Sequence, residues 1–102
     1  MGEILLSLSS EYQAKLRSPE EAASVVKSGQ WVDYCMSLSQ PTLLDAALAR
    51  RKDELQDVKI RASLTLEPRQ VVSVDPHRET FTFCSWHFGG YERKLQEPNL
   101  CN

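Results

Sequence analysis

The sequence predicts an α/β fold in which a mostly parallel sheet is flanked by helices. Two observations favour this class. Segments whose apolar residues recur at helical spacing alternate with segments rich in β-branched and aromatic residues. The chain has 102 residues, 41% of them hydrophobic and 25% charged, which is typical of a globular protein with a single core. We therefore expect one α/β unit without internal repeats.

The first predicted element is a helix that begins after Ser18. Pro19 suits the first helical position, where no N–H donor is needed, and Glu21 lies three residues after Ser18, as in a capping box. We expect this helix to continue through Val26. Gly29 then marks its end, because glycine readily adopts the left-handed conformation that closes helices.

A strand and a second helix follow. Residues 31–36 are rich in β-preferring side chains, which predicts a buried strand, and residues 37–40 form a short polar loop. Pro41 opens a helix whose polar face includes residues 50–53. The apolar face of that helix is predicted to consist of Leu43, Leu44, Ala47, Leu48 and Leu55.

Three further β-rich runs complete the pattern. Residues 71–74 look like a short strand that ends at Pro76, and residues 81–84 form another strand before the aromatic, glycine-containing segment 86–91. Residues 58–66 show the period-two alternation of a strand with one buried face. The side chains predicted to point inward from that strand are Val58, Ile60, Ala62, Leu64 and Leu66.

Charge and hydropathy exclude several functional classes. Lys and Arg total 12 against 14 for Asp and Glu, giving a net charge of -2, so the chain has no global cationic field for nucleic acid or anionic lipid. No apolar stretch approaches the roughly 20 residues that span a bilayer. The leucines near the amino terminus are too few, and lack the flanking features, for a signal peptide. We expect a cytoplasmic protein.

The cysteines support the same expectation. Cys35, Cys84 and Cys101 are odd in number and widely spaced, which argues against a secreted disulfide framework and favours reduced thiols. Cys84 and His87 form half of a zinc-like pair, but structural zinc normally needs a second close pair. A small zinc protein is therefore the weakest alternative, and we predict no metal site.

The loop that follows the first strand is the first candidate binding site. In open α/β sheets, ligands bind beyond the carboxyl ends of the strands, where loops and helix N-termini meet. Ser39 and Gln40 lie at such a strand-to-helix connection, so its N–H groups are candidates for binding a carboxylate or a thioester oxygen. The alternative is a purely structural turn, because every fold of this class contains several.

The second candidate is the run from Ser85 to Tyr91. Trp86 supplies an aromatic wall, His87 an acid, base or orienting group, and Gly89 and Gly90 allow close approach of the backbone to a ligand. The alternative is a tight turn whose aromatic side chains fill the core. Neither loop contains a complete catalytic set of residues, and no nucleotide-binding or hydrolase motif is present.

Most of the chain, from about Tyr12 to Asn102, resembles the amino-terminal region of the 4-hydroxybutyrate coenzyme A transferase and acetyl-CoA hydrolase/transferase family. The resemblance is collinear, which makes it more specific than any single motif. The segments that carry it read SPEEAASVVKSGQWVDY, QPTLLDAALARRKDELQDVKIR, DPHRETFTF, SWHFGGYERK and NLCN.

The resemblance implies part of a Rossmann-like CoA-transferase domain, in a two-domain enzyme that moves coenzyme A from an acyl-CoA to a carboxylic acid through a glutamyl thioester. The glutamate and the glycine-rich coenzyme A loop belong to the family's second half. Residues 1–102 are thus expected to form the amino-terminal portion of the first domain, with the catalytic second domain absent. The coenzyme A thioester is a substrate, and no cofactor is implied.

Alone, the chain is expected to transfer nothing and to need the remaining part of the transferase as its partner. It should also self-associate, because an incomplete parallel sheet leaves open edges and faces. No residue of this chain is predicted to be catalytic. We expect Ser39, Gln40, Trp86, His87, Gly89 and Gly90 to form walls and donors of a substrate pocket. The alternative is a non-catalytic α/β interaction module.

Overall fold

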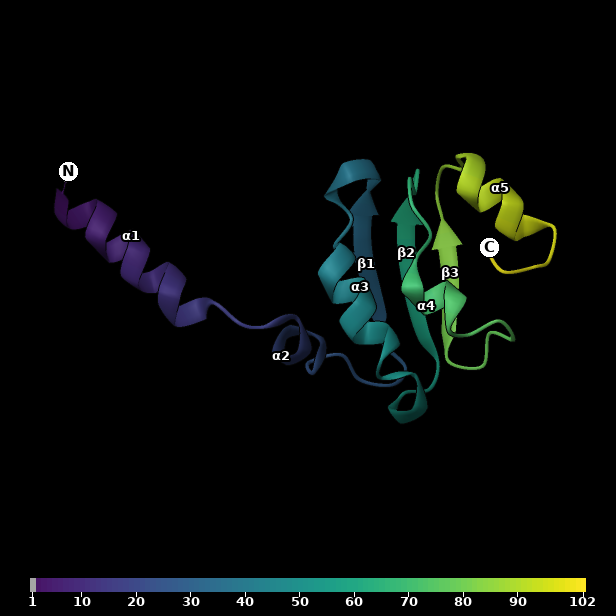
Figure 1. Ribbon diagram of the computed structural model, residues 1–102, viewed down its shortest axis with the longest axis horizontal. Coiled ribbons are helices and arrows are strands. Elements are labelled where there is room, and N and C mark those ends of the chain that lie inside the picture. Colours follow the sequence, from purple (N-terminus) through teal and green to yellow (C-terminus); the bar gives the residue numbers. More distant parts are fainter. Residues whose placement is uncertain (1) are drawn as a thin grey trace.

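The computed structural model describes the backbone of residues 2–102 and the side chains from residue 8 onward. A parallel sheet of three strands in the order β1-β2-β3 forms its centre, which confirms the predicted α/β class (Figure 1). The helices, in chain order, are α1 (Gly2–Lys15), α2 (Pro19–Ala23), α3 (Thr42–Ala49), α4 (Gln70–Ser73) and α5 (Gly90–Gln96). The strands are β1 (Trp31–Met36), β2 (Val58–Ser63) and β3 (Phe81–Ser85), and short 3-10 turns, η1 and η2, span Ser37–Ser39 and Lys52–Glu54.

The core lies on one face of the sheet. Alternate residues of β2 and β3 are buried, and α3 and α4 lie in front of this face in Figure 1. The alternation predicted for residues 58–62 is therefore correct. The main core side chains are Tyr34, Leu48, Ile60, Val71 and Phe83.

The opposite face is polar and aromatic, and we call it the open face. Parallel pairing places Trp31 beside Lys59 and Asp33 beside Arg61, and Cys84 continues the second row on β3. The Lys59 Nζ lies 5.8 Å from the centre of the Trp31 ring, within reach of a cation–π contact. Among the residues described, Trp31 remains well exposed, so β1 is not the fully buried strand that its composition predicts. It lies at the edge of the sheet and buries only Tyr34.

The start of α2 follows the prediction, but its end does not. The Glu21 N–H donates to Ser18 Oγ at 3.1 Å, and the Ser18 N–H donates to Glu21 Oε1 at 3.3 Å, which completes the capping box. The helix stops at Ala23 instead of reaching Val26. The Arg51 guanidinium donates hydrogen bonds to the carbonyl oxygens of Ala23 and Val26, at 2.6 and 2.8 Å, and so satisfies carbonyls at the helix end. α1 extends away from the body of the molecule in Figure 1.

The strand predicted at residues 71–74 is wrong, since this segment forms α4. Asp45, a buried residue of α3, accepts hydrogen bonds from the N–H groups of Gln70 at 2.6 Å and Val71 at 3.3 Å. These are donors that a helix start leaves without intrahelical partners. The Tyr34 hydroxyl also donates to Asp45, and burial, together with this carboxylate, raises the pKa of Tyr34. A cap supplied from 25 residues away is not visible in local sequence.

Two apolar side chains also differ from the prediction. Leu43 was expected on the buried face of α3 but is exposed, because the helix buries Ala47, Leu48 and Ala49 instead. Leu66 was expected to continue the inward row of β2, but the strand ends at Ser63. The next residue, Leu64, has a φ of 48°, which turns the chain away from the sheet.

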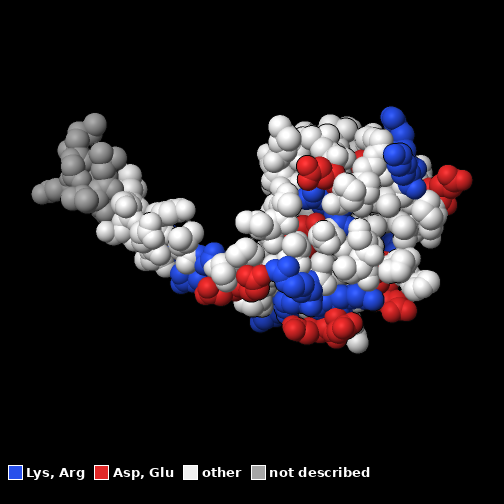
Figure 2. Space-filling view, viewed as in Figure 1, with Lys and Arg blue, Asp and Glu red and all other residues white. Residues whose placement is uncertain are grey.

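Charged side chains are mixed rather than segregated. Figure 2 shows blue and red side chains side by side along the lower end of the body, so neither sign dominates there. Arg50 and Glu20 form one ion pair between α3 and α2, and Arg51 and Glu54 form another at 3.0 Å. None of the helices described in residues 2–102 has the length and apolar character needed to cross a membrane. Cys35, Cys84 and Cys101 are free thiols in the structure.

A buried carboxylate joins the ends of β2, β3 and α5. Glu92 is fully buried, and its Oε1 accepts hydrogen bonds from the Thr65 N–H at 2.6 Å and the Ser85 hydroxyl at 3.2 Å. Its Oε2 accepts from the Gly89 N–H at 2.9 Å. Burial alone raises the pKa of Glu92, but the N–H donors more than offset this, so the pKa lies below its ordinary value.

We predict that Glu92→Gln lowers the free energy of unfolding by about 2–4 kcal/mol at pH 7, because an amide nitrogen then faces buried N–H donors. The folded-state pKa is depressed, so the stabilising effect is complete above the unfolded pKa of about 4.3 and is lost as pH falls through the folded value. Urea unfolding at pH 7 and pH 3 should therefore show a smaller difference between the parent chain and the variant in acid. Glu97→Gln, at an exposed site, is the control, and an equal loss in both variants would contradict the prediction.

Gly29 occupies the one glycine position with a left-handed backbone, at a φ of 83°. We predict that Gly29→Ala destabilises the chain by about 1–2 kcal/mol, because a Cβ is strained in this conformation. Gly90→Ala is the matched control, since a Cβ there meets no atom within 4 Å. Thermal unfolding measures both, and equal effects would show that conformation at Gly29 is unimportant.

Candidate functional site

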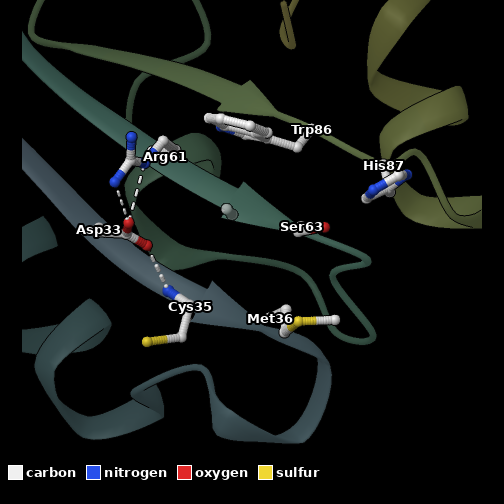
Figure 3. A pocket seen from close by; sticks show the side chains of 8 residues that line it. Asp33, Cys35, Met36, Arg61, Ser63, Trp86 and His87 are labelled. Carbon is white, nitrogen blue, oxygen red and sulfur yellow. Dashed lines mark hydrogen bonds and ion pairs between the residues drawn. The ribbon is translucent and has the colours of Figure 1, made fainter.

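A groove of about 620 Å³ opens where β1 and β2 end, at the carboxyl edge of the sheet. We call it the strand-end groove. Figure 3 shows that the end of β1 forms one wall, β2 the floor, and the segment after β3 the other wall. The residues that line it are Asp33, Cys35, Met36, Arg61, Ala62, Ser63, Trp86 and His87.

An ion pair and an aromatic ring define one side of the groove. The Arg61 Nε donates to Asp33 Oδ2 at 2.9 Å, and the guanidinium carbon lies 5.5 Å from the centre of the Trp86 ring. Asp33 Oδ1 accepts the Cys35 N–H at 2.8 Å. This N–H, and next the guanidinium, hold the pKa of Asp33 below its ordinary value. Arg61 is thereby fixed between a carboxylate and an indole.

The end of β1 bulges toward the groove. Between the pairs Asp33–Arg61 and Met36–Ser63, β1 contains one residue more than β2. Cys35 absorbs the extra residue with a φ of 64°, and Ser37 follows with a φ of 50°. Such left-handed conformations are costly for residues other than glycine and tend to occur at functional sites. Here they direct the β1 end into the wall of the groove.

The opposite wall is held by backbone hydrogen bonds. The Trp86 N–H donates to the Ala62 carbonyl at 3.1 Å, and the Leu64 N–H donates to the His87 carbonyl at 2.9 Å. The His87 imidazole itself is exposed beside the groove. The segment is therefore anchored through its backbone while two of its side chains remain available to a ligand.

The six predicted pocket residues do not share one place. Trp86 and His87 line the strand-end groove, whereas Gln40 lines a second, smaller cavity. Gly89 donates its N–H to Glu92, and Gly90 begins α5. Ser39 is exposed in η1 and lines neither of these two hollows. A binding role for each of the six remains a prediction.

The second cavity measures about 100 Å³ and lies between the loops that follow β1 and β2. We call it the loop cavity. It is next to the groove, because Gln40 Nε2 donates to the carbonyl of Ser63, which lines the groove. The loop cavity is lined by Ser37, Leu38, Gln40, Thr42, Leu66, Glu67 and Arg69.

Sequence reasoning missed Asp33, Arg61 and Ser63 as groove residues. Their types carry no motif, and their proximity depends on the register between two parallel strands, which local patterns do not reveal. A weak signal was available, since Asp33 and Arg61 interrupt two β-rich runs. No group of three or more potential metal ligands gathers among the described residues.

The groove offers shape and hydrogen-bond donors rather than a complete reaction centre. Met36, Ala62 and Trp86 provide apolar walls, and Arg61 and His87 provide polar groups. The one carboxylate that lines it, Asp33, is engaged by both Arg61 and the Cys35 N–H. This arrangement suits the binding of a small, partly apolar molecule with a polar end.

The chain is similar to known proteins of one family. Residues 6–84 match the model of the acetyl-CoA hydrolase/transferase N-terminal domain. The butyryl-CoA:acetate CoA-transferase of Anaerostipes caccae is 43% identical over 89 residues, which cover 87% of this chain and 20% of that protein. A probable butyrate:acetyl-CoA coenzyme A-transferase of Syntrophomonas wolfei is 46% identical over 90 residues, covering 88% of this chain and 20% of that protein.

A third relative, the succinyl-CoA:cyclohexane-1-carboxylate CoA transferase of Geobacter metallireducens, is 45% identical over 62 residues, or 61% of this chain and 14% of its own length. No solved structure gives a significant match. The chain thus spans about a fifth of the length of the first two relatives. The chain belongs to the acetyl-CoA hydrolase/transferase family, and the part of that family it matches is the N-terminal domain.

Proposed function

We propose that this chain forms the amino-terminal part of an acyl-CoA:carboxylate CoA-transferase and supplies one side of its substrate site. The observation that carries the proposal is the strand-end groove, which lies where α/β sheets bind ligands. The matched relatives are named as CoA-transferases, and all three names pair an acyl-CoA with a carboxylic acid. The acyl-CoA and the acid are accordingly the proposed substrates.

In this proposal the groove holds the acyl part of the thioester. Trp86 and Met36 cover its apolar carbons, and the His87 imidazole donates a hydrogen bond to its carbonyl oxygen. Ser39 and Gly90 are proposed as further donors beyond the groove, and Gly89 as part of its wall, because the Gly89 N–H already donates to Glu92. The acyl groups we favour are acetyl and butyryl, with 4-hydroxybutyryl as a further candidate from the same resemblance.

The reaction would proceed through a glutamyl-CoA thioester whose glutamate comes from another part of the enzyme. The glutamate carboxylate attacks the thioester carbonyl and the coenzyme A thiolate leaves, which gives a mixed anhydride. The thiolate then attacks the glutamyl carbonyl of the anhydride, which releases the carboxylate of the acyl group and leaves the glutamyl-CoA thioester. Preorganised donors stabilise the oxyanions that form in both steps. Residues 1–102 contribute walls and donors, so the isolated chain should show no transfer. No cofactor is required in this scheme, and a cytoplasmic location belongs to the same proposal.

The second candidate function is a non-catalytic α/β interaction module. It is favoured by one observation, which is that the open face remains uncovered in the residues described while Trp31 and Trp86 stand exposed on it. Exposed aromatic side chains of this kind mark interaction surfaces. The two functions differ in whether the groove supports turnover.

A chimeric enzyme tests the proposal. This chain would replace the matching segment of the Syntrophomonas wolfei relative, and transfer from butyryl-CoA to acetate would be measured. We predict activity, and a fall in kcat/KM of about 10- to 100-fold in His87→Ala, because one hydrogen bond to the developing oxyanion is lost.

His77→Ala is the matched control, since His77 is the other histidine of the chain and is exposed away from the groove. It should retain the parent value within about twofold. A folded chimera without activity would favour the interaction module. Equal losses of kcat/KM in the two histidine variants would show that His87 does not act at the site.

A further inference from the structure

The first helix carries an apolar stripe that the described part of the chain leaves uncovered. α1 extends away from the body of the molecule, and every described residue from 8 to 17 is exposed (Figure 1). Leu8, Tyr12 and Leu16 follow one another at intervals of four residues, which places them on one side of the helix. Their exposed fractions are 57%, 61% and 52%. Three large side chains on one side of α1 are thus left in water.

A helix of this kind needs a partner to be stable. α1 has 14 residues, and isolated helices shorter than about 12–15 residues are marginal in water. Ser9 and Ser10 lie near its middle and have a lower helix propensity than alanine or leucine. The ion pair between Lys15 and Glu11, at 2.7 Å, is exposed and contributes little. Packing of the stripe against another surface would supply the missing stabilisation.

The connection between α1 and α2 holds the stripe away from the body of its own chain. Arg17 Nη1 donates to the carbonyl oxygens of Ala14 and Leu16, at 2.8 Å in each case, which fixes Arg17 against the end of α1. The next residue, Ser18, belongs to the capping box of α2. Because both sides of the connection are engaged, α1 has little freedom to fold back. The partner of the stripe is therefore expected outside this copy of the chain.

The order of side chains along the stripe suits a second copy of the chain. Leucine, tyrosine and leucine at equal intervals read the same in both directions, and a two-fold interface requires such a self-complementary surface. In an antiparallel pair of α1 helices centred on Tyr12, Leu8 of each copy meets Leu16 of the other. The two Tyr12 rings then meet at the two-fold axis. Each exposed side chain of the stripe thereby gains an apolar partner.

An apolar hollow lies where this pair of helices would end. It has a volume of about 500 Å³ and is formed by residues 17–19, Ala22 of α2 and residues 41–44 at the start of α3. We call it the elbow hollow. Leu43, which lines it, is 71% exposed. The six residues of α1 that precede Leu8, about 9 Å of helix, would extend past Leu16 of the other copy to this hollow.

We propose that two copies of this chain associate through an antiparallel pair of α1 helices, with the start of each α1 seated in the elbow hollow of the other copy. A specific interface buries about 1,200 Å² or more. Because three side chains from each copy are few for that area, the two elbow hollows are a necessary part of the interface.

This surface lies outside the sheet, whereas self-association was expected from the open edges and faces of the sheet. The elbow hollow shares no lining residue with the strand-end groove, so the pairing leaves the groove free. The association therefore does not depend on the proposed function.

Sedimentation equilibrium of the full chain tests the association. We expect the parent chain to dimerise with a Kd on the order of 10 µM. The double variant Leu8→Gln, Tyr12→Gln should raise the Kd about tenfold or more, because glutamine keeps a good helix propensity but removes the apolar stripe. Leu43→Gln, in the elbow hollow, should also raise the Kd. An unchanged Kd in Leu43→Gln would overturn the seating of α1 in the elbow hollow.

Two further variants serve as controls. Ser10→Gln should keep the parent Kd within about twofold, because Ser10 is exposed on the side of α1 opposite to the stripe. Trp31→Ser removes an exposed side chain of the open face and should also leave the Kd unchanged. The proposal would be overturned by a parent chain that stays monomeric at about 200 µM. It would equally be overturned by stripe variants that associate as the parent does, or by loss of the dimer in Trp31→Ser alone.

Dityrosine cross-linking tests the register of the two helices. Photo-oxidation of the dimer should link Tyr12 of one copy to Tyr12 of the other, and mass spectrometry of the digested product would identify this link. Tyr12→Phe should keep the dimer and lose the link, because phenylalanine keeps the ring without the hydroxyl. A parallel pair would form the same link but leave the elbow hollow empty, so the result for Leu43→Gln separates the two orientations. A dimer of the parent chain without the Tyr12 link would overturn the proposed pairing.

Discussion

The buried Glu92 carboxylate is the interaction that joins the floor of the candidate site to one of its walls, the segment after β3. It receives donors from the segment after β2, from the end of β3 and from the turn that starts α5. A carboxylate without solvent must be hydrogen-bonded to remain charged, and three donors from three segments meet this need. The same contacts that make the charge tolerable therefore position Trp86 and His87 relative to the end of β2.

Two other buried carboxylates also connect separate segments by accepting their hydrogen bonds. Asp45 connects α3 to the start of α4 and to Tyr34 on β1. Asp75 accepts the N–H groups of Thr80 at 2.9 Å and Phe81 at 2.7 Å, which fixes the entry of β3. A small sheet covered by short helices has many loop N–H groups to satisfy, and carboxylates satisfy several at once. Loop geometry here is thus determined by side chains distant in sequence.

Because side chains distant in sequence determine the loops, only the features that depend on neighbouring residues could be predicted from the sequence. The capping box at Ser18 and the existence of strands at residues 31–36 and 81–84 depend on neighbouring residues and were predicted correctly, although the first of these strands is not buried as expected. The helix at residues 70–73 was predicted as a strand, because its valines favour β structure locally while Asp45 caps it from another helix. Of the predicted site residues, Trp86 and His87 line the strand-end groove, and a binding role for them stays a prediction. Asp33 and Arg61 were not found, because only the strand register brings them together.

The engagement of these acids bears on where a nucleophile could come from. A carboxylate that attacks a thioester must be able to approach its carbonyl, yet Asp33, Asp45 and Glu92 are each held in place by at least two hydrogen bonds. The donors around Asp33 and Glu92 also hold their pKa values low, which stabilises the anion and weakens it as a nucleophile. Using any of the three in covalent chemistry would break the contacts that shape the groove. In the function proposed above, the attacking carboxylate would come from a separate structural element, and that element would meet the exposed walls of the groove.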